Sequence, residues 1–195
     1  MRLAIFGGTF DPVHKAHVAM AREAADRFHL DRVLFVPSSN PPHKPAGTYA
    51  SFEDRIRMAE LAISGDARLE VSRLEQGRGP NYSADTIEKV RESLAPGDEL
   101  FFLIGADAFA EIETWHRWRD VARAVEFIVV SRPGHQYRTP PNTRVERLET
   151  LDLPVSSSEI RTSLALGQRS PEIPEPVLSF ISERGLYGVP VPAKE

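Results

Sequence analysis

Two histidines three residues apart stand in the segment of the chain that is best suited to chemistry. The segment is Gly7-Gly8-Thr9-Phe10-Asp11-Pro12-Val13-His14-Lys15-Ala16-His17, between a short apolar run and a helical pattern. Residues three apart share one face of a helix, and the first N–H groups of a helix are unpaired and carry its positive dipole end. The two glycines let the backbone approach a bulky anion closely. We therefore expect His14 and His17 to clamp the oxygens of a phosphate chain.

Other interpretations of this segment are weaker. A P-loop would continue with Gly-Lys-Ser/Thr, and the dinucleotide fingerprint would read G-x-G-x-x-G; neither pattern is present. A histidine pair could bind zinc, but no third carboxylate or histidine follows at helical spacing, so we expect no protein metal site. Two structural surface histidines remain the simple alternative. Asp11, beside Pro12, is typical of a turn or cap residue rather than a base.

A second segment, Val155-Ser156-Ser157-Ser158-Glu159-Ile160-Arg161, could also bind phosphate. Serines before a helix are good N-caps, and Ser157 or Ser158 could cap this one. Hydroxyls and free N–H groups at a helix start also bind phosphate, and Arg161, one turn further on, could add a charged fork. Two such helix starts in one domain favour a triphosphate over a single phosphate group.

Alternating apolar patterns predict the elements that position these segments. Strands are expected over residues 3–6, 32–36, 69–72, 100–104 and 127–130. Helices are expected after Pro12, over 52–64, 84–94, 157–166 and 176–184, and in a stretch with two tryptophans after residue 104; Gly185 should cap the last helix. Such β-α alternation predicts a doubly wound α/β domain with a parallel sheet. We expect one domain over residues 1–195, with the second phosphate motif and the C-terminal helices in about 155–187.

Composition narrows the class of protein. The 195 residues are 41% hydrophobic and 27% charged, which is typical of a globular chain. The formal net charge of −4 argues against a non-specific nucleic-acid binder. No cysteine is present for a disulfide or a thiolate site, and no apolar run approaches the length of a transmembrane helix. The sequence therefore predicts a cytoplasmic protein without nucleic-acid or membrane partners. Its oligomeric state does not follow from the sequence.

The chain resembles a known family. The first segment is similar to the H-x-G-H signature of nucleotidyltransferases that act on mononucleotides, and the second to their S-S-T-x-I-R signature. Further segments narrow the resemblance to the bacterial nicotinate-nucleotide adenylyltransferase family. They are residues 36–37, 40–44 (NPPHK), 81–86 (NYSADT), 104–107 (IGAD), 114–118 (TWHRW), 131–134 (SRPG) and 185–187 (GLY). Three positions depart from the family pattern: Ala16 replaces glycine, Ser158 replaces threonine, and His116 stands where tyrosine is common.

The resemblance implies a Rossmann-like nucleotidyltransferase fold and a reaction in NAD biosynthesis. ATP and nicotinate mononucleotide would give nicotinate adenine dinucleotide and pyrophosphate. The mononucleotide phosphate is already ionised, so no side-chain nucleophile is needed, and catalysis would rest on positioning and charge stabilisation. Mg²⁺ would arrive with ATP rather than in a protein cage.

The resemblance also implies roles for individual residues. His14, His17 and Arg161 would be catalytic, with His17 meeting charge at the α-phosphate and Arg161 holding the β- and γ-phosphates. The expected ATP-binding residues are Gly7, Gly8, Thr9, Phe10, His14, His17, Lys44, Gly105, Asp107, Arg132, Ser157, Ser158 and Arg161. The expected mononucleotide-binding residues are Tyr82, Ser83, Trp115 and His116.

Simpler roles compete for three of these residues. Lys44 could be a solvated loop lysine, Asp107 could be a helix N-cap rather than a ribose ligand, and Trp115 with Trp118 could be core packing. At the level of the protein, alternatives are a phosphopantetheine or nicotinamide-mononucleotide adenylyltransferase and a non-catalytic nucleotide-binding protein of the same fold. The NPPHK, NYSADT and TWHRW segments argue against a phosphopantetheine enzyme. Intact His14, His17 and Arg161 together argue against a non-catalytic protein.

Overall fold

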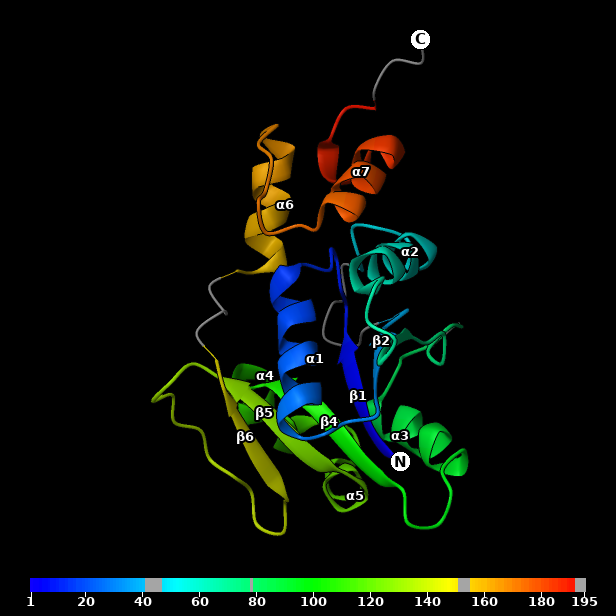
Figure 1. The fold of residues 1–195 in the computed structure, drawn as a ribbon, viewed down its shortest axis with the longest axis vertical. Helices are drawn as coiled ribbons and strands as arrows, with labels where there is room; N and C mark the ends of the chain where they lie inside the picture. Colours follow the sequence, from blue (N-terminus) through cyan, green and yellow to red (C-terminus); the bar gives the residue numbers. More distant parts are fainter. Residues whose placement is uncertain (41–46, 78, 151–154, 192–195) are drawn as a thin grey trace.

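Six parallel strands form one sheet in the computed structural model, which describes residues 1–40, 47–77, 79–150 and 155–191. The strands are β1 (Arg2–Gly8), β2 (Arg32–Pro37), β3 (Leu69–Val71), β4 (Glu99–Gly105), β5 (Glu126–Ser131) and β6 (Val145–Glu149). Their order across the sheet is β3-β2-β1-β4-β5-β6, and every neighbouring pair is parallel (Figure 1). All five strands expected from the sequence are present.

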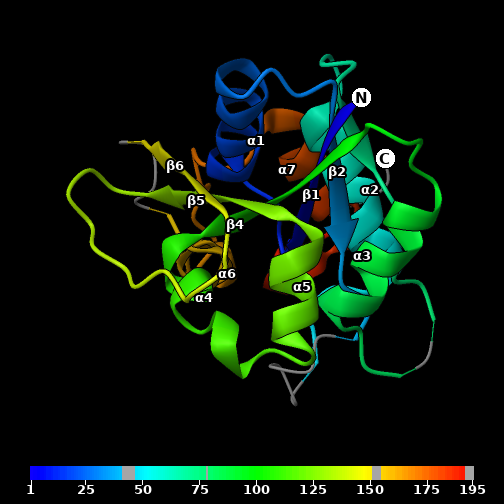
Figure 2. The same ribbon diagram turned by 90° about the horizontal axis from the view of Figure 1, so that it is seen from below.

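Helices cover both faces of this sheet. They are α1 (Lys15–Arg27), α2 (Phe52–Ile63), α3 (Ser83–Glu92), α4 (Ala106–Ala110), α5 (Trp118–Ala124), α6 (Ser157–Ala165) and α7 (Glu175–Arg184), with short 3₁₀ turns η1 (Ile112–Thr114) and η2 (Leu186–Gly188). In Figure 2, α1 and α7 lie on one side of the sheet, and α3, α4 and α5 lie on the other. Within the described ranges, no helix is both long and apolar enough to cross a membrane.

The hydrophobic core is divided between the two faces. Ala4 and Phe6 of β1 pack in one cluster with residues of α1, α2 and α7, whereas Leu3 and Ile5 pack in a second cluster with residues of α3 and α5. Successive side chains of a strand point to opposite faces, so β1 contributes to both clusters. Two buried faces require the near-continuous apolar strands that the sequence shows. The expected doubly wound α/β fold is confirmed.

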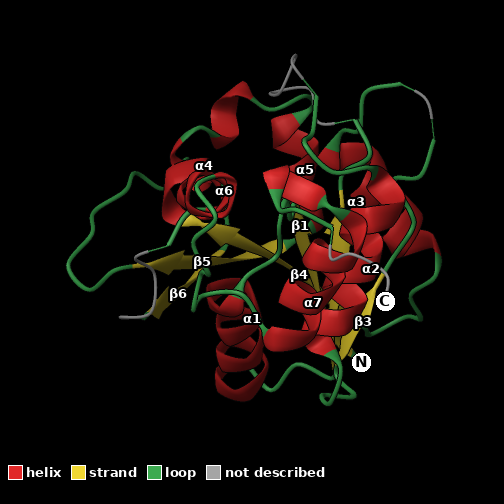
Figure 3. Cartoon of the chain, turned by 90° about the horizontal axis from the view of Figure 1, so that it is seen from above, coloured by secondary structure: helices red, strands yellow, loops and turns green. Residues whose placement is uncertain are grey.

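The strand order reverses at β1. This strand pairs with β2 along one edge and with β4 along the other. In open α/β sheets, the connections at such a reversal diverge to opposite faces and leave a crevice at the carboxyl ends of the strands, where ligands bind. Figure 3 looks down on this end of the molecule, over which α6 lies. The Gly7-to-His17 segment begins here, at the end of β1.

Helix ends follow capping chemistry, with two differences from the expectations. Helix α1 begins at Lys15 instead of directly after Pro12, because His14 is the extended N-cap residue. Ser156, rather than Ser157 or Ser158, caps α6: its Oγ accepts a hydrogen bond from the Glu159 N–H at 3.2 Å, and the Glu159 carboxylate accepts from the Ser156 N–H at 3.1 Å. This reciprocal pair is a capping box. Gly185 caps α7 in the left-handed conformation, as predicted.

Strand β6 is the element that the sequence patterns missed. Parallel neighbours are usually joined through a helix, but residues 132–144 between β5 and β6 contain none. The strand itself reads VERLE, in which Leu148 alone is buried. A strand at the edge of a sheet can be polar along most of its length, so a short charged run with one leucine carries no periodic signal.

Leu148 should nevertheless stabilise the fold strongly. It has no exposed surface and packs in the α1-side core with Ile128 and Val130 of β5. We expect Leu148→Ala to lower the free energy of unfolding by about 2–5 kcal/mol, as cavity-forming substitutions do. Urea unfolding would measure this. The matched control is Glu146→Ala in the same strand, whose exposed side chain should change stability by less than about 0.5 kcal/mol. Equal stability of the two variants would contradict the placement of β6.

Candidate active site

Two cavities flank the carboxyl end of β1. The first, here called the α1-side cavity, has a volume of about 580 Å³ and lies between the start of α1, the ends of β4 and β5, and the start of α6. The second, the α3-side cavity, has a volume of about 410 Å³ and lies between the ends of β1 and β2, the start of α3 and the η1–α5 junction. Phe6 lines the first cavity, and Gly7 lines the second. Because consecutive strand residues face opposite sides, the end of β1 is the border between the two cavities.

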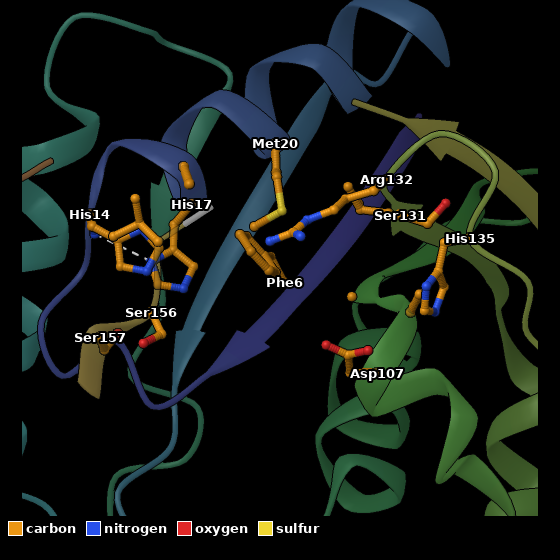
Figure 4. A pocket seen from close by; sticks show the side chains of 15 residues that line it. Phe6, His14, His17, Met20, Asp107, Ser131, Arg132, His135, Ser156 and Ser157 are labelled. Atoms are coloured by element: carbon orange, nitrogen blue, oxygen red, sulfur yellow. Dashed lines mark hydrogen bonds between the residues drawn. The ribbon is translucent and has the colours of Figure 1, made fainter. Parts of the chain in front are cut away.

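His14 and His17 stack against each other on the wall of the α1-side cavity. Their ring centroids lie 3.7 Å apart with the planes inclined by 27°. The His14 backbone N–H donates to His17 Nδ1 at 3.2 Å, drawn as a dashed line in Figure 4. Since Nδ1 accepts this bond, the proton of the neutral His17 ring is on Nε2. His17 therefore has a fixed tautomer with an N–H donor on the other side of its ring.

Burial keeps both histidines neutral. His14 is only 4% exposed, and burial lowers its pKa to about 4. Burial, and to a lesser extent the neighbouring His14, hold the pKa of His17 well below its usual value. His14 Nδ1 is buried and makes no hydrogen bond within the described part of the chain. An anion in the cavity would offer an acceptor to this ring and would favour its protonated form.

The two helix starts differ in the N–H groups that they leave unpaired. At α1, the Lys15 N–H donates to the Glu172 carbonyl at 2.8 Å and the His17 N–H to the His14 carbonyl, so Ala16 keeps the unpaired group. At α6, the N–H groups of Ser157 and Ser158 both lack a partner within the described residues. The start of α6 is thus the stronger backbone anion site of the two. Ala16 lies inside regular helix, where a methyl group is tolerated in place of the family glycine.

The opposite wall of the α1-side cavity comes from β4, α4 and the loop after β5. Gly105, Asp107 and Arg132, three of the residues expected to bind ATP, line it. Asp107 lies in the first turn of α4, whose N-cap is Gly105, so the N-cap interpretation of Asp107 is wrong. His135 also lines this wall, across the cavity from His17 (Figure 4).

His135 is an ionisable residue of this wall that sequence reasoning missed. A signal was available, because His135 directly follows the Arg132-Pro133-Gly134 turn at the carboxyl end of a predicted strand. The other lining residues that were not anticipated are Phe6, Ala16, Met20, Ala106, Val130, Ser131, Val155 and Ser156.

Three described residues that were expected to bind ATP line neither cavity: Phe10, Ser158 and Arg161. Phe10 is 2% exposed and packs edge-on against the rings of Phe6 and His17, so it supports the histidine from beneath. The Phe10 ring also explains why residue 8 is a glycine, because a Cβ atom at this position would lie 2.9 Å from the ring. Ser158 is exposed on α6. Lys44 falls outside the described residues.

Arg161 is the third of these residues. Its Nη1 donates to the Asp11 carbonyl at 2.6 Å, and its guanidinium lies 4.2 Å from the centre of the Tyr49 ring. Ser157, one turn earlier on α6, lines the α1-side cavity and donates its Oγ to the Pro12 carbonyl at 3.0 Å. The structure therefore places Arg161 against the loop that precedes the two histidines, beside the cavity rather than on its wall.

The α3-side cavity gathers all four expected mononucleotide-binding residues. The rings of Tyr82 and His116 contact each other at 4.4 Å between centroids, and half-buried Trp115 meets Phe102 edge-on at 5.8 Å. Ser83 is the first residue of α3, and neither its N–H nor that of His116 has a partner within the described residues. The cavity thus combines aromatic walls with two backbone donors.

Other residues of this cavity were not anticipated in this place. Gly7, Gly8 and Thr9, which were expected near ATP, line the α3-side cavity instead. Asn81, next to Tyr82, accepts from the Asn40 N–H at 2.6 Å and so ties the β2 loop to the start of α3. Its position beside Tyr82 was the available signal. The remaining unanticipated residues are Ser38, Glu75, Phe102 and Thr114.

The fold and the two helix starts together indicate a class of protein. A parallel sheet with a strand-order reversal, a histidine pair at one helix start and a serine-capped second helix start are typical of a nucleotidyltransferase. The cytidylyltransferase-like family profile matches residues 5–163. In the described part of the chain, no cluster of three histidine or carboxylate side chains could hold a metal ion.

Similar proteins narrow the class. A protein of Solibacter usitatus named probable nicotinate-nucleotide adenylyltransferase is 62% identical over 96% of this chain and all of its own length. One of the same name from Gloeobacter violaceus is 40% identical over 98% of each chain. The solved structure of Plasmodium falciparum nicotinic acid mononucleotide adenylyltransferase complexed with NaAD has the same fold, with a TM-score of 0.81, 19% identity and coverage of 98% of this chain and 99% of that one. The chain belongs to the nicotinate-nucleotide adenylyltransferase family, as the sequence motifs predicted.

The neutral histidines predict a specific dependence of stability on pH. A histidine in the unfolded chain titrates near 6.5, whereas His14 in the folded state has a pKa of about 4. Between these values the unfolded state binds more protons, so the free energy of unfolding falls as the pH falls from 6.5 towards 4. We expect His14 alone to remove about 2 kcal/mol between pH 7.5 and pH 5.

Urea unfolding of the wild type and of His14→Asn at these two pH values would measure this contribution. Asparagine is a good N-cap and does not titrate, so the variant should fold and lose less stability on acidification. The same loss in both proteins would contradict the assignment of a neutral, buried His14.

Proposed function

We propose that the chain transfers the adenylyl group of ATP to nicotinate mononucleotide, with ATP in the α1-side cavity and the mononucleotide in the α3-side cavity. The placement of these two cavities on either side of the end of β1 is the observation that carries this proposal. A phosphate reaching over Gly7 and Gly8 from one cavity meets a triphosphate held in the other. The direct test is pyrophosphate release with ATP and each candidate mononucleotide.

The triphosphate is held between the two helix starts. Ser157 and Ser158 offer unpaired N–H groups to the β- and γ-phosphates, and the leaving pyrophosphate stays on the same donors. Arg161 exchanges its bond to the Asp11 carbonyl for phosphate oxygens, which satisfy a guanidinium better than a single carbonyl does. Asp107, on the opposite wall, accepts from the ribose hydroxyls. Arg132 and Lys44 add positive charge from the loops.

The transfer itself is one displacement at phosphorus. A phosphate oxygen of nicotinate mononucleotide attacks the α-phosphorus of ATP, a new P–O bond forms, and the bond from the α-phosphorus to the bridging oxygen breaks. Pyrophosphate leaves with the electron pair of that bond. His17 donates from Nε2 to the α-phosphate oxygens as charge grows there, and the stacked His14 donates beside it. No side chain needs to act as nucleophile.

Mg²⁺ would be bound together with ATP rather than in a site built by the protein alone. Asp107 is the carboxylate that lines the α1-side cavity, and the other polar groups there are imidazole, hydroxyl and guanidinium. Mg²⁺ requires six oxygen ligands, so this donor set fits an ion that takes most of its ligands from phosphates and water. When bound, the ion neutralises phosphate charge. Asp107 is the residue of this wall that could contact it.

The nicotinate ring is recognised by stacking and by two backbone donors. Trp115 covers the ring, and the unpaired N–H groups of Ser83 and His116 bind the two oxygens of the carboxylate. A carboxamide would have to turn its own NH₂ towards one of these donors, and that donor would lose its hydrogen bond. Because the donors belong to the backbone, the tyrosine-to-histidine departure at position 116 leaves recognition intact.

The role of His17 predicts a loss of turnover without a loss of fold. We expect His17→Ala to lower kcat by about 100-fold, because one donor to developing charge is typically worth about 3 kcal/mol in the transition state. Pyrophosphate release under saturating substrates would measure kcat, and circular dichroism would report the fold. Arg27→Ala, an exposed change at the far end of α1, is the control and should keep full activity. Near-normal turnover of folded His17→Ala would exclude this role.

The two backbone donors predict substrate preference. The ratio of kcat/KM for nicotinate over nicotinamide mononucleotide should be at least about 100, from one unmet hydrogen bond and the lost charge assistance. Rates at matched concentrations of the two mononucleotides would give this ratio.

Two variants separate the donors from the aromatic walls. Trp115→Ala should weaken the binding of both mononucleotides to a similar extent, because stacking on the ring does not depend on the carboxylate. His116→Ala should preserve the ratio, because the backbone N–H remains. A ratio near one in the wild type, or a ratio that collapses in His116→Ala, would argue against recognition by the backbone.

A further inference from the structure

Tyr187 reaches from the C-terminal end of the fold to the loop that carries the two histidines. Its hydroxyl donates to Asp11 Oδ1 at 2.7 Å, across 176 positions of sequence. It lies in η2, beyond residue 163, where the match to the family profile ends. We propose that Tyr187 is a positioning residue for adenylyl transfer, which acts through Asp11 on the placement of the histidine pair. This inference rests on the proposed function.

Asp11 is a buried carboxylate that is held entirely by donors. It is 1% exposed, and besides Tyr187 it accepts from the Tyr49 N–H at 2.7 Å and from the Ala50 N–H at 3.1 Å. Its place in the loop agrees with the expected turn residue rather than with a base. A buried charge must be fully hydrogen-bonded to be tolerated, so the loss of one donor makes other positions of the carboxylate competitive.

Arg55 of α2 also holds this loop. Its side chain has no exposed surface, and its Nη1 donates to the Thr9 carbonyl at 2.8 Å. The positive charge of Arg55 lies close enough to the Asp11 carboxylate to interact with it electrostatically. Residues 9–11 are therefore held by Arg55 of α2, by the backbone of Tyr49 and Ala50, and by Tyr187 of η2.

Three C-terminal groups converge on residues 11 and 12, directly before the histidine pair. Arg161 donates to the Asp11 carbonyl, Ser157 donates to the Pro12 carbonyl, and Tyr187 donates to the Asp11 carboxylate. When Arg161 turns to the phosphates, the bonds of Ser157 and Tyr187 still attach the loop before α1 to the start of α6 and to η2. Transfer between two bound substrates depends on sub-ångström placement, so a looser loop should weaken the triphosphate contacts and slow the reaction.

The backbone of Tyr187 is held in a conformation that is unfavourable for a non-glycine residue. Its φ of 58° and ψ of 28° lie in the left-handed region, between Gly185 and Gly188, which also have positive φ. A non-glycine residue is unfavourable in this conformation, and such residues cluster at functional positions. The ring also packs against the core, a role that phenylalanine could fill, but phenylalanine could not bond to Asp11. The hydroxyl is thus the group to test.

The experiment compares Tyr187→Phe with the wild type in pyrophosphate release and in ATP binding by calorimetry. Tyr187→Phe should keep the fold, lower kcat/KM for ATP about tenfold through both kcat and KM, and weaken ATP binding, while KM for nicotinate mononucleotide changes less than twofold. Ser182→Ala is the matched control, because it removes a hydroxyl bond of 3.1 Å within α7 that does not reach the loop. It should behave as the wild type.

A double-mutant cycle tests whether Tyr187 acts through Asp11. In an Asp11→Asn background, Tyr187→Phe should cause little further loss, whereas independent effects would multiply and would overturn the proposed route. Unchanged kcat, KM and ATP affinity in Tyr187→Phe would overturn the positioning role. The role would also be overturned if active-site titration showed that the whole loss of activity comes from a smaller fraction of active enzyme. A wild type that binds ATP but does not release pyrophosphate would instead overturn the proposed function. In that case the ATP affinity of Tyr187→Phe would still test the contact between Tyr187 and Asp11.

Discussion

The central place of β1 in the sheet is the constraint on which the rest of the structure depends. With β2 on one edge and β4 on the other, its carboxyl end opens onto both faces, and consecutive residues line different cavities. Both glycines form this end, and the histidine segment follows it directly. A reaction between two phosphate-containing substrates needs one point where both can meet, and the reversal of strand order provides it.

The starts of α1 and α6 offer different kinds of hydrogen-bond donor to an anion. The start of α1 offers neutral, stacked imidazoles with a fixed tautomer, whereas the start of α6 offers unpaired N–H groups close to Arg161. In the proposed function, the neutral imidazoles act mainly on charge that grows during the transfer. The permanent charge of Arg161 would act on phosphates that are charged before and after the reaction. This division fits a reaction without a covalent enzyme intermediate.

Local pattern predicted most of the fold, and the exceptions have physical causes. Strands β1, β4 and β5 are buried on both faces, so each one appears in the sequence as a continuous apolar run that can be recognised without knowledge of its neighbours. Strand β6 has one buried residue and no preceding helix, so its pairing depends on the neighbouring strand. The choice of Ser156 over Ser157 as the α6 cap depends on the position of Glu159 three residues later. The helical stretch with two tryptophans is divided at Arg117, whose left-handed backbone opens α5.

The sequence by itself determined the residue types and spacings that chemistry requires: the glycines, the histidine pair, the serine-rich helix start and the aromatic segments, and with them the family. Only the tertiary structure decided how these groups are distributed between the two cavities. It placed Gly7 and Gly8 beside the aromatic segments that contain Tyr82 and Trp115, and it buried Phe10 beneath His17. It also added His135 to the wall opposite and joined Tyr187 to Asp11. Spacing along a chain fixes neighbours within a helix or strand, but contacts between distant segments arise only when the sheet and its two layers of helices are packed.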